Sequence, residues 1–306
     1  MSAGETPRLL AVPNVSEGRD EALIGRLAHA FSHGAVLLDV HSDPDHNRTV
    51  FTLAPSRRDL VEPLASGARA AIDELTLAGH AGEHPHVGVL DVCPVVFLAP
   101  ETRDEAREQA MAVAHRIADA GVPVFLYGML ASEPDRRERA HFRRGGPAEL
   151  ARRMESGELK PDLGPQHVHP TAGATLVTAR PPLAAFNLEL EGASLEAARE
   201  IAAELREAGG GLPGVRAIGL ALGGGRIQIS TNVHDPIAIP LAEVVARVRE
   251  LASARGAGIV AAEVVGLVPA AALEGFPADL PLPGFDPARG VIEERLRALA
   301  ANEPTG

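Results

Sequence analysis

The stretch "AVLLDVHSDPDHNRTVFTLA", residues 35–54, contains two apolar runs on either side of a short polar connection. Residues 35–40 form the first run, and the loop "HSDPDHN" returns the chain to the second run, "RTVFTLA", at 48–54. Short apolar runs bounded by turn residues are typical of buried strands. We therefore predict two consecutive strands with no helix between them.

Helical patterns lie on both sides of this pair of strands. A helix is expected from Ser16 until Gly34 ends it, and the apolar residues on its one face are Leu23, Ile24, Leu27 and Phe31. A second helix is expected at 60–75, and further strands at 9–15 and 89–98. The order of elements is therefore β-α-β-β-α-β.

The remaining chain continues and then repeats this order. A helix is expected to begin at Thr102, which has capping-box spacing to Glu105, and to lead to the strand "PVFLYG" at 123–128. In the second half, strands are expected at 183–190, 215–222, 226–232 and 258–265, and helices at 194–208 and 241–254. We predict an α/β (α+β) fold with two similar subdomains, residues 1–180 and 181–306, and with helices packed on mixed sheets.

Composition limits the classes of partner. The 306-residue chain has a formal net charge of −12, one tyrosine and no tryptophan, which argues against a nucleic-acid-binding surface. Its single cysteine, Cys93, has no second cysteine in the chain to pair with. No apolar run has the length of a membrane span, and no signal segment is recognisable at the N-terminus. We expect a soluble cytoplasmic protein.

The segment "GPQHVHPTAG" at 164–173 is rich in glycine, proline and histidine. Such a composition is typical of an irregular loop. We expect this loop at the boundary between the two subdomains, with a ligand cleft between them, because domain boundaries often hold ligand sites.

A second polar segment, "GHAGEHPHVGVLDV" at 79–92, contains three histidines and a glutamate. It could form a metal site, carry a catalytic base or simply be a polar turn. The four-residue spacing of His80 and His84 suggests a metal-binding helix, but Gly82 and Pro85 both disfavour a helix there.

The pairs His84/His86 and His167/His169 each have the two-residue spacing of a strand. Two such pairs leave a metal-dependent hydrolase as an alternative function. The predicted order of elements differs, however, from the eight-stranded barrel that usually carries these pairs.

Several motifs occur in one collinear order between residues 9 and 269. They are "VPNVSEGRD" (12–20), "LLDVHSDPDHNRTV" (37–50), "GEHPHVGVLDVCP" (82–94), "VPVFLYG", "PDLGP", "AFNLEL", "QISTNVHDP" and "EVVGLVP". In these motifs the chain resembles the glutamate formimidoyltransferases, which include the formiminotransferase part of formimidoyltransferase-cyclodeaminase. The chain after Gly275 has no recognisable role.

The resemblance implies an enzyme that transfers a one-carbon group. It would move the formimino group of N-formimino-L-glutamate to tetrahydrofolate in histidine degradation, with tetrahydrofolate as co-substrate and without a metal. It also implies a homodimer of chains with two α/β subdomains, and small-molecule substrates rather than nucleic acid or membrane partners. A folate-binding protein without catalytic activity is the alternative.

By the same resemblance, the catalytic residue is the histidine of "GEHP", His84. One imidazole can remove a proton from the attacking nitrogen and deliver a proton to the leaving nitrogen near neutral pH. Pro85 would fix the backbone. Glu83 would either orient the ring or lie in solvent.

The family's folate-binding segment corresponds to Gly164, Pro165, Gln166, His167, Val168, His169, Pro170, Thr171, Ala172 and Gly173. Glycine and proline let the backbone approach a flat pterin ring closely. The alternative for this segment is a plain domain linker. The roles of His167 and His169 stay open.

Anion binding is expected from arginines. Five of them lie between residues 136 and 144 in "DRRERAHFRR", and Arg143 matches a family arginine before a glycine. Arg48 begins a strand beside the "SDPDHN" loop, where Asn47 would also bind ligand or close the turn. Guanidinium groups suit the carboxylates of formimino-glutamate. A solvated helix face is the alternative for Arg136, Arg137 and Arg139.

Two positions depart from the family pattern. His41 stands where the family has an aspartate, and His86 stands where an arginine follows "GEHP". We retain His41 as a substrate-binding candidate. If His84 leans on a carboxylate, that group must come from Asp39, Asp43, Asp45 or Glu83.

Cys93 is a candidate nucleophile by its nearness to His84 in sequence. Its apolar strand favours a buried, unreactive thiol instead.

Overall fold

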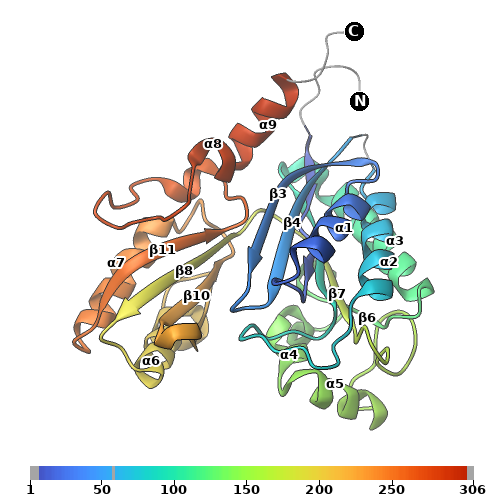
Figure 1. Cartoon of the computed structure of the whole chain (residues 1–306), viewed down its shortest axis with the longest axis horizontal. Coiled ribbons are helices and arrows are strands. Elements are labelled where there is room, and N and C mark those ends of the chain that lie inside the picture. The colour runs from blue at the N-terminus through green and yellow to red at the C-terminus, as the bar shows by residue number, and fades with distance from the viewer. Residues whose placement is uncertain (1–6, 57–58, 302–306) are drawn as a thin grey trace. The chain divides into compact units, whose positions relative to one another are not determined.

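The computed structural model describes residues 7–56 and 59–301. Its internal contacts divide the chain into two units, Met1–Arg180 and Pro181–Gly306. Each unit contains one β-sheet with helices packed on it (Figure 1).

The first unit is built on a seven-stranded sheet. Its strands are β1 (Leu9–Ala11), β2 (Asn14–Val15), β3 (Ala35–Asp43), β4 (Arg48–Pro55), β5 (Leu90–Phe97), β6 (Val124–Leu126) and β7 (Thr175–Arg180). They follow the order β1-β4-β2-β5-β7-β6, and β3 pairs with β4. Strand β7 runs parallel to β5 and β6, and the other pairings are antiparallel. This sheet is mixed, as predicted.

Helices pack on both faces of this sheet. They are α1 (Glu21–Phe31), α2 (Val61–Glu74), α3 (Arg103–Asp119), α4 (Arg139–Arg143) and α5 (Gly146–Glu155). Adjacent residues of a strand point to opposite faces. Accordingly, Val177 of β7 belongs to the core under α1, α2 and α3, whereas Leu176 packs with Phe142 of α4 and Leu150 of α5. Figure 1 shows the two groups of helices apart from each other.

The first predicted strand and helix need correction. The strand expected at 9–15 is interrupted at Val12 and Pro13 and forms β1 and β2. Helix α1 begins at Glu21 rather than at Ser16, with Asp20 as its N-cap. Ser16 is instead tied to the sheet, because its Oγ donates a hydrogen bond to the Gly88 carbonyl at 2.8 Å.

The pair of strands at 35–54 forms as predicted, but its connection is shorter. Strand β3 continues to Asp43, which pairs with Arg48, so the first three of the seven residues in the expected loop "HSDPDHN" are strand. In the turn after β3, the Asp43 carboxylate accepts hydrogen bonds from the backbone N–H groups of Asp45 and His46. Asn47 has a φ of 47°, a left-handed conformation that asparagine tolerates, and closes the turn.

The loop at 164–173 does not mark the boundary between the units. It is followed by the unpredicted strand β7, which pairs with β5 and β6, so the loop lies inside the first unit. The predicted capping box at Thr102 is also absent. Its hydroxyl donates a hydrogen bond to the Ala99 carbonyl at 2.9 Å and accepts none from the backbone N–H groups of the first turn of α3.

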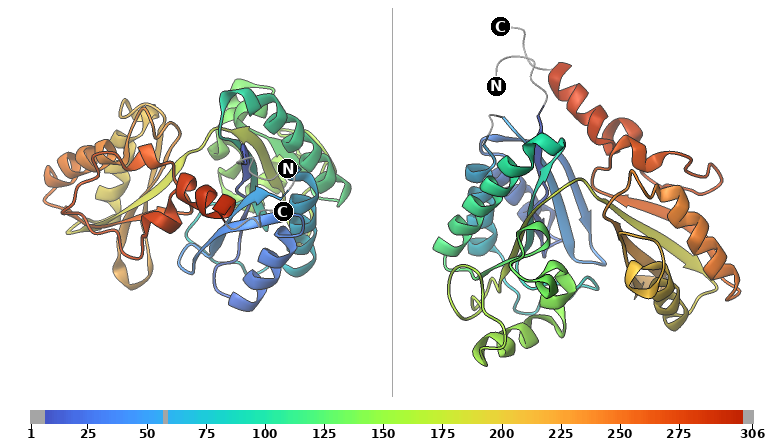
Figure 2. Two further views of the ribbon diagram at one scale, coloured as in Figure 1. Left: turned by 90° about the horizontal axis from the view of Figure 1, so that it is seen from above. Right: turned by 180° about the vertical axis from the view of Figure 1, so that it is seen from behind.

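The second unit has the predicted order of elements. These are β8 (Ala184–Glu191), α6 (Leu195–Leu205), β9 (Val215–Ala221), β10 (Ile227–Val233), α7 (Leu241–Ser253) and β11 (Gly258–Val265), followed by α8 (Pro287–Gly290) and α9 (Ile292–Ala301). Phe186 and Leu188 of β8 pack against Ile201 of α6 and Val248 of α7. Both helices therefore cover one face of the sheet (Figure 2).

The second sheet is antiparallel throughout, so the prediction of a mixed sheet is wrong for this unit. Its strand order is β11-β8-β10-β9. Strands β8 and β9 run in the same direction, but β10 lies between them and opposes both. The first sheet contains the same order of strands, with β5 in the place of β11, the broken strand β1 and β2 in the place of β8, β4 in the place of β10 and β3 in the place of β9. It has two further strands, β7 and β6, beyond β5.

Among the described residues, none of the helices combines the length and the apolar composition needed to cross a bilayer. The homodimer and the ligand cleft between subdomains stay predictions.

Candidate active site

His84 lies in the loop between α2 and β5. Its ring is partly exposed, but its Nδ1 atom is buried. No described residue makes a hydrogen bond to this atom. Burial lowers the pKa of His84 well below 6.5, and the charges that lower it further belong to Arg48, Arg143, Arg139 and His46. The imidazole is therefore neutral at pH 7 and able to accept a proton.

Two arginines near His84 share one buried carboxylate. The Arg48 guanidinium donates to Asp91 Oδ2 at 2.7 Å, and Arg143 donates to the same oxygen. The Asp91 side chain is fully buried, and its Oδ1 accepts from the Val87 backbone at 2.9 Å. Arg48 also donates to Asn14 Oδ1 at 3.1 Å.

The charges of this group do not cancel. Burial raises the pKa of Asp91, but the charges of Arg143 and Arg48 and the hydrogen bonds to Asp91 outweigh burial and hold that pKa at about 2. Asp91 is therefore ionised, and two guanidinium groups face one carboxylate. Burial lowers the pKa of Arg48 to about 10, which leaves this arginine charged at pH 7. The net charge of one positive unit favours a bound anion.

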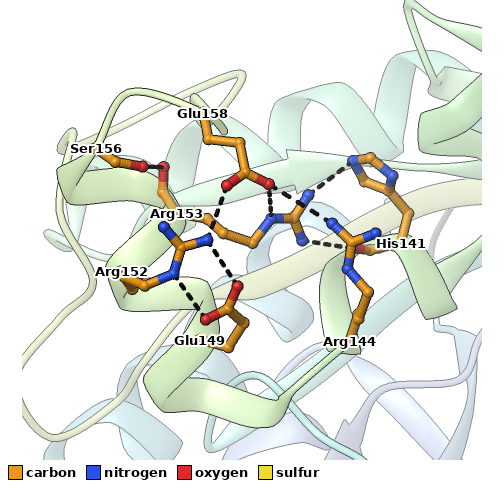
Figure 3. A network of polar contacts seen from close by, with 7 residues as sticks. All are labelled: His141, Arg144, Glu149, Arg152, Arg153, Ser156 and Glu158. Atoms are coloured by element: carbon orange, nitrogen blue, oxygen red, sulfur yellow. Dashed lines mark hydrogen bonds and ion pairs between the residues drawn. The ribbon is translucent and has the colours of Figure 1, made fainter.

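Helix α4 carries Arg143 and is held by a polar network (Figure 3). Arg153 of α5 is only 2% exposed. It donates to the His141 carbonyl at 2.7 Å and to Glu158 at 2.9 Å. His141 precedes Arg143 by two residues in α4. Arg153 therefore holds in place the helix that positions Arg143 against Asp91.

The arginines of "DRRERAHFRR" have different roles. Arg136 is structural, because it pairs with Asp162 and lies over the rings of Phe125 and Phe142. Arg137 is exposed. Arg144 is exposed too and pairs with Glu158 at 3.5 Å (Figure 3). The alternative of a solvated helix face therefore fits the exposed Arg137 but not Arg136 or the partly buried Arg139.

The loop at 164–173 lies against the loop that carries His84. Two backbone hydrogen bonds join them, Leu77 N to Thr171 O (2.9 Å) and Val89 N to Ala172 O (2.9 Å), and directly after the segment Ala174 N donates to Val87 O (3.0 Å). Gly173 has a φ of 72°, and a Cβ atom there would lie 2.4 Å from the Val87 carbonyl oxygen. Only glycine allows this close approach. The expected folate-binding segment and the expected base are thus joined.

Comparison with known proteins identifies the family of this chain. The model of the formiminotransferase domain, N-terminal subdomain, matches residues 8–180, and the model of the formiminotransferase domain matches residues 185–276. The chain belongs to the formiminotransferase family.

Relatives in this family come from distant organisms. The glutamate formimidoyltransferase of Streptococcus pyogenes is 37% identical over 266 residues, which cover 86% of this chain and 89% of that protein. The glutamate formimidoyltransferase of Thermoplasma acidophilum is 35% identical over 95% of this chain and 97% of its own length. The formimidoyltransferase-cyclodeaminase of Sus scrofa is 39% identical over 86% of this chain but only 50% of its own length.

Within this formiminotransferase-family chain, the segment at 164–173 has a solvent-exposed side. Gly164, Gln166, His167, Pro170 and Thr171 are exposed, Pro165, Val168 and His169 are partly exposed, and Ala172 and Gly173 are buried. His169 Nδ1 accepts a hydrogen bond from the Ala172 backbone at 3.0 Å, so this histidine closes a turn.

His41 lies on β3 opposite Val50, and Asp43 lies opposite Arg48. Because residues two apart share a face of a strand, His41 and Arg48 lie on the same face of the sheet. The Asp43 carboxylate binds His46 Nδ1 at 2.5 Å and not His84. Among the described side chains, no carboxylate bonds to the buried nitrogen of His84. Glu83 is exposed.

The histidines of the two HxH pairs make other contacts. His86 Nδ1 lies 3.2 Å from the His84 carbonyl oxygen, and its ring packs against His80 with 4.4 Å between centroids. In the described part of the chain, no three histidine, cysteine or acidic residues form a group able to hold a metal. Cys93 is fully buried, and burial raises its pKa to about 12, so its thiol is protonated at neutral pH.

Asp91 is the residue that sequence reasoning missed. It stands between Leu90 and Val92 in an apolar strand. An ionisable residue inside such a strand is rarely buried without a partner, and this is the signal that could have identified it.

Proposed function

We propose that this chain is a glutamate formimidoyltransferase, which moves the formimino group of N-formimino-L-glutamate to tetrahydrofolate with His84 as acid and base. The observation that carries the proposal is a neutral imidazole with an unpartnered nitrogen beside an arginine cluster of net positive charge. Two relatives whose alignments cover 86% and 95% of this chain are named glutamate formimidoyltransferase, and their names support the same activity.

The reaction needs two proton transfers at nitrogen. A folate nitrogen attacks the carbon of the protonated formimino group and forms a new C–N bond, while the π electron pair of the C=N bond moves onto the imino nitrogen and the folate nitrogen loses its proton to His84. The resulting tetrahedral intermediate carries the folate, imino and glutamate nitrogens on one carbon. Protonated His84 then gives its proton to the glutamate nitrogen, the C–N bond to glutamate breaks as the imino lone pair re-forms the C=N bond, and the imidazole returns to its neutral form.

Arg48 and Arg143 serve this chemistry in two ways. They bind a carboxylate of the donor through charge-assisted hydrogen bonds. The bound carboxylate also offsets the positive charges that lower the pKa of His84 in the free protein. That pKa should therefore rise in the substrate complex, and His84 becomes able to hold the proton between the two transfers.

The loop at 164–173 is the proposed folate-binding segment. Its exposed residues offer backbone groups to the pterin ring, and its hydrogen bonds to the His84 loop support a short distance between the folate nitrogen and the base. We propose His41 as a further substrate-binding residue, because it shares a sheet face with Arg48.

The direct test mixes purified protein, tetrahydrofolate and N-formimino-L-glutamate, and measures released glutamate together with the folate product. His84→Ala should lower turnover by about 10²- to 10⁴-fold. The control is His115→Ala, which changes an exposed histidine on α3 and should leave turnover unchanged.

Three results would contradict the proposal. A folded wild-type protein that binds tetrahydrofolate but releases no glutamate would be a folate-binding protein without this activity. Equal loss of turnover and folate affinity in His84→Ala would make His84 a binding residue. Turnover within about tenfold of wild type would assign the base to another group.

A further inference from the structure

Arg139 is a cation that the proposed reaction leaves without a role. It begins α4 and precedes Arg143 by one helical turn, so the two side chains lie on the same side of the helix. Arg143 contacts the buried Asp91. Arg139 therefore stands at the edge of the same arginine cluster, and it is partly buried there.

The guanidinium of Arg139 makes no hydrogen bond or ion pair within the described ranges, unlike those of Arg48, Arg136 and Arg143. Burial lowers the pKa of Arg139, and the charge of Arg143 lowers it further. The nearby Tyr127, Asp91 and Glu138 act in the opposite direction but do not restore it. Holding this charge in place therefore costs folding free energy.

The formal charges around Arg139 indicate which kind of ligand would bind there. Arg48, Arg139 and Arg143 contribute three positive charges, and Asp91 contributes one negative charge. The charges of Arg180 and Glu138, which also act on Arg139, are opposite and cancel in this sum. The cluster thus exceeds neutrality by two positive charges in a chain whose formal net charge is −12. A ligand with two carboxylates would neutralise it, whereas a ligand with one carboxylate would leave Arg139 unpaired.

We propose that Arg139 binds the second carboxylate of a glutamyl dicarboxylate whose first carboxylate is held by Arg48 and Arg143. The Cβ atoms of residues four apart on a helix are separated by roughly 6 Å, so two flexible arginines can reach both ends of a glutamate side chain. The inference rests on the proposed function for the identity of the donor. The dicarboxylate is either the formimino-glutamate donor or the glutamate tail of folate.

The first experiment measures binding to the full chain by calorimetry, with glutarate as the dicarboxylate and butyrate as the monocarboxylate. Arg139→Gln should weaken glutarate binding by about tenfold or more, as expected for loss of a charged hydrogen-bond partner, and should change butyrate binding little. Arg139→Lys should recover part of the affinity for glutarate. The control is Arg137→Gln, which removes an equal charge from an exposed position two residues away.

Stability gives an independent measurement. Because Arg139 is partly buried next to another arginine and has no ion pair, Arg139→Gln should leave the melting temperature unchanged or raise it. A structural arginine such as Arg153 should behave in the opposite way, since its removal leaves the Glu158 contact and the His141 carbonyl without their partner. A clear drop in the melting temperature of Arg139→Gln would overturn the proposal.

Kinetics then distinguish the two sources of the dicarboxylate. If the donor is the source, Arg139→Gln raises KM for formimino-glutamate far more than KM for its γ-amide. If the folate tail is the source, the variant raises KM for tetrahydrofolate but not for tetrahydropteroate, which lacks the glutamate. Unchanged KM ratios in both series, or equal weakening of glutarate and butyrate, would overturn the inference.

Failure of the proposed function would look different. A wild-type protein that transfers no formimino group but binds glutarate through Arg139 would keep the dicarboxylate site and reject the formimino chemistry. A protein that transfers the group with Arg139→Gln as well as the wild type does would keep the proposed function and reject the role of Arg139.

Discussion

Replacing the buried Asp91 by asparagine should destabilise the folded protein in a pH-dependent way. The substitution keeps the approximate shape of the side chain, removes its charge and replaces one accepting oxygen with an amide nitrogen that can only donate. Arg48 and Arg143 both donate to Asp91 Oδ2, so the variant leaves two buried guanidinium groups without their shared carboxylate. Breaking a buried ion pair in this way typically costs about 3–5 kcal/mol.

The pH-dependent part of this cost follows from the pKa of Asp91, which folding lowers from 3.8 to about 2. A difference of nearly two pKa units corresponds to about 2.5 kcal/mol of stability. Because the folded pKa lies below the unfolded pKa, this contribution is fully present above pH 4 and is lost as the pH falls through 2. At pH 3 about half of it, roughly 1.3 kcal/mol, remains.

The assay is urea unfolding of wild type and Asp91→Asn at pH 7, 5, 4 and 3. The difference in unfolding free energy should be constant from pH 7 to 5 and should shrink by about 1 kcal/mol on reaching pH 3. Asp119→Asn, which changes an exposed residue at the end of α3, is the control for general charge effects. An Asp91→Asn variant as stable as wild type, or a difference that does not change between pH 7 and 3, would refute the reasoning.

The other predictions concern the catalytic base His84, the close contact of Gly173 with Val87 and the metal content. The pH profile of kcat/KM should rise through a pKa well below 6.5, and this rise should disappear in His84→Ala. The profile of kcat should rise at a higher pH, because bound carboxylates offset the arginine charges that lower the pKa of His84. A rise of kcat/KM centred above pH 6.5 would contradict a neutral His84. Gly173→Ala should lower the melting temperature more than Gly157→Ala, because both glycines have positive φ but only Gly173 has a carbonyl 2.4 Å from the added Cβ; equal losses would argue against the crowding. Elemental analysis should find no stoichiometric zinc or iron, and chelators should leave transfer unchanged, whereas one metal per chain lost with activity in His169→Ala would support the hydrolase alternative.

Local sequence patterns were sufficient for the order of the elements in the second unit and for most of the first. Helices and strands impose periods of 3.6 and 2 on their apolar residues, and these periods are readable within a single segment. The β-α-β-β-α-β order of the second unit and the strand pair at 35–54 follow from such patterns. The position of His84 in "GEHP" was equally local, and the family assignment came from motifs of the same length.

Contacts between distant segments could not be predicted in this way. Asp91 lies 43 residues from Arg48 and 52 residues from Arg143, and only the sheet register and the packing of α4 bring the three together. Strand β7 was missed because its place between β5 and β6 is set by parallel pairing across the chain rather than by a local turn. The low pKa of His84 likewise depends on burial and on arginines from two other elements. The sequence by itself determined the order of most helices and strands and which histidine to test. The tertiary structure decided where β7 pairs and which charges surround that histidine, because pairing and electrostatic interactions depend on distances in space and not along the chain.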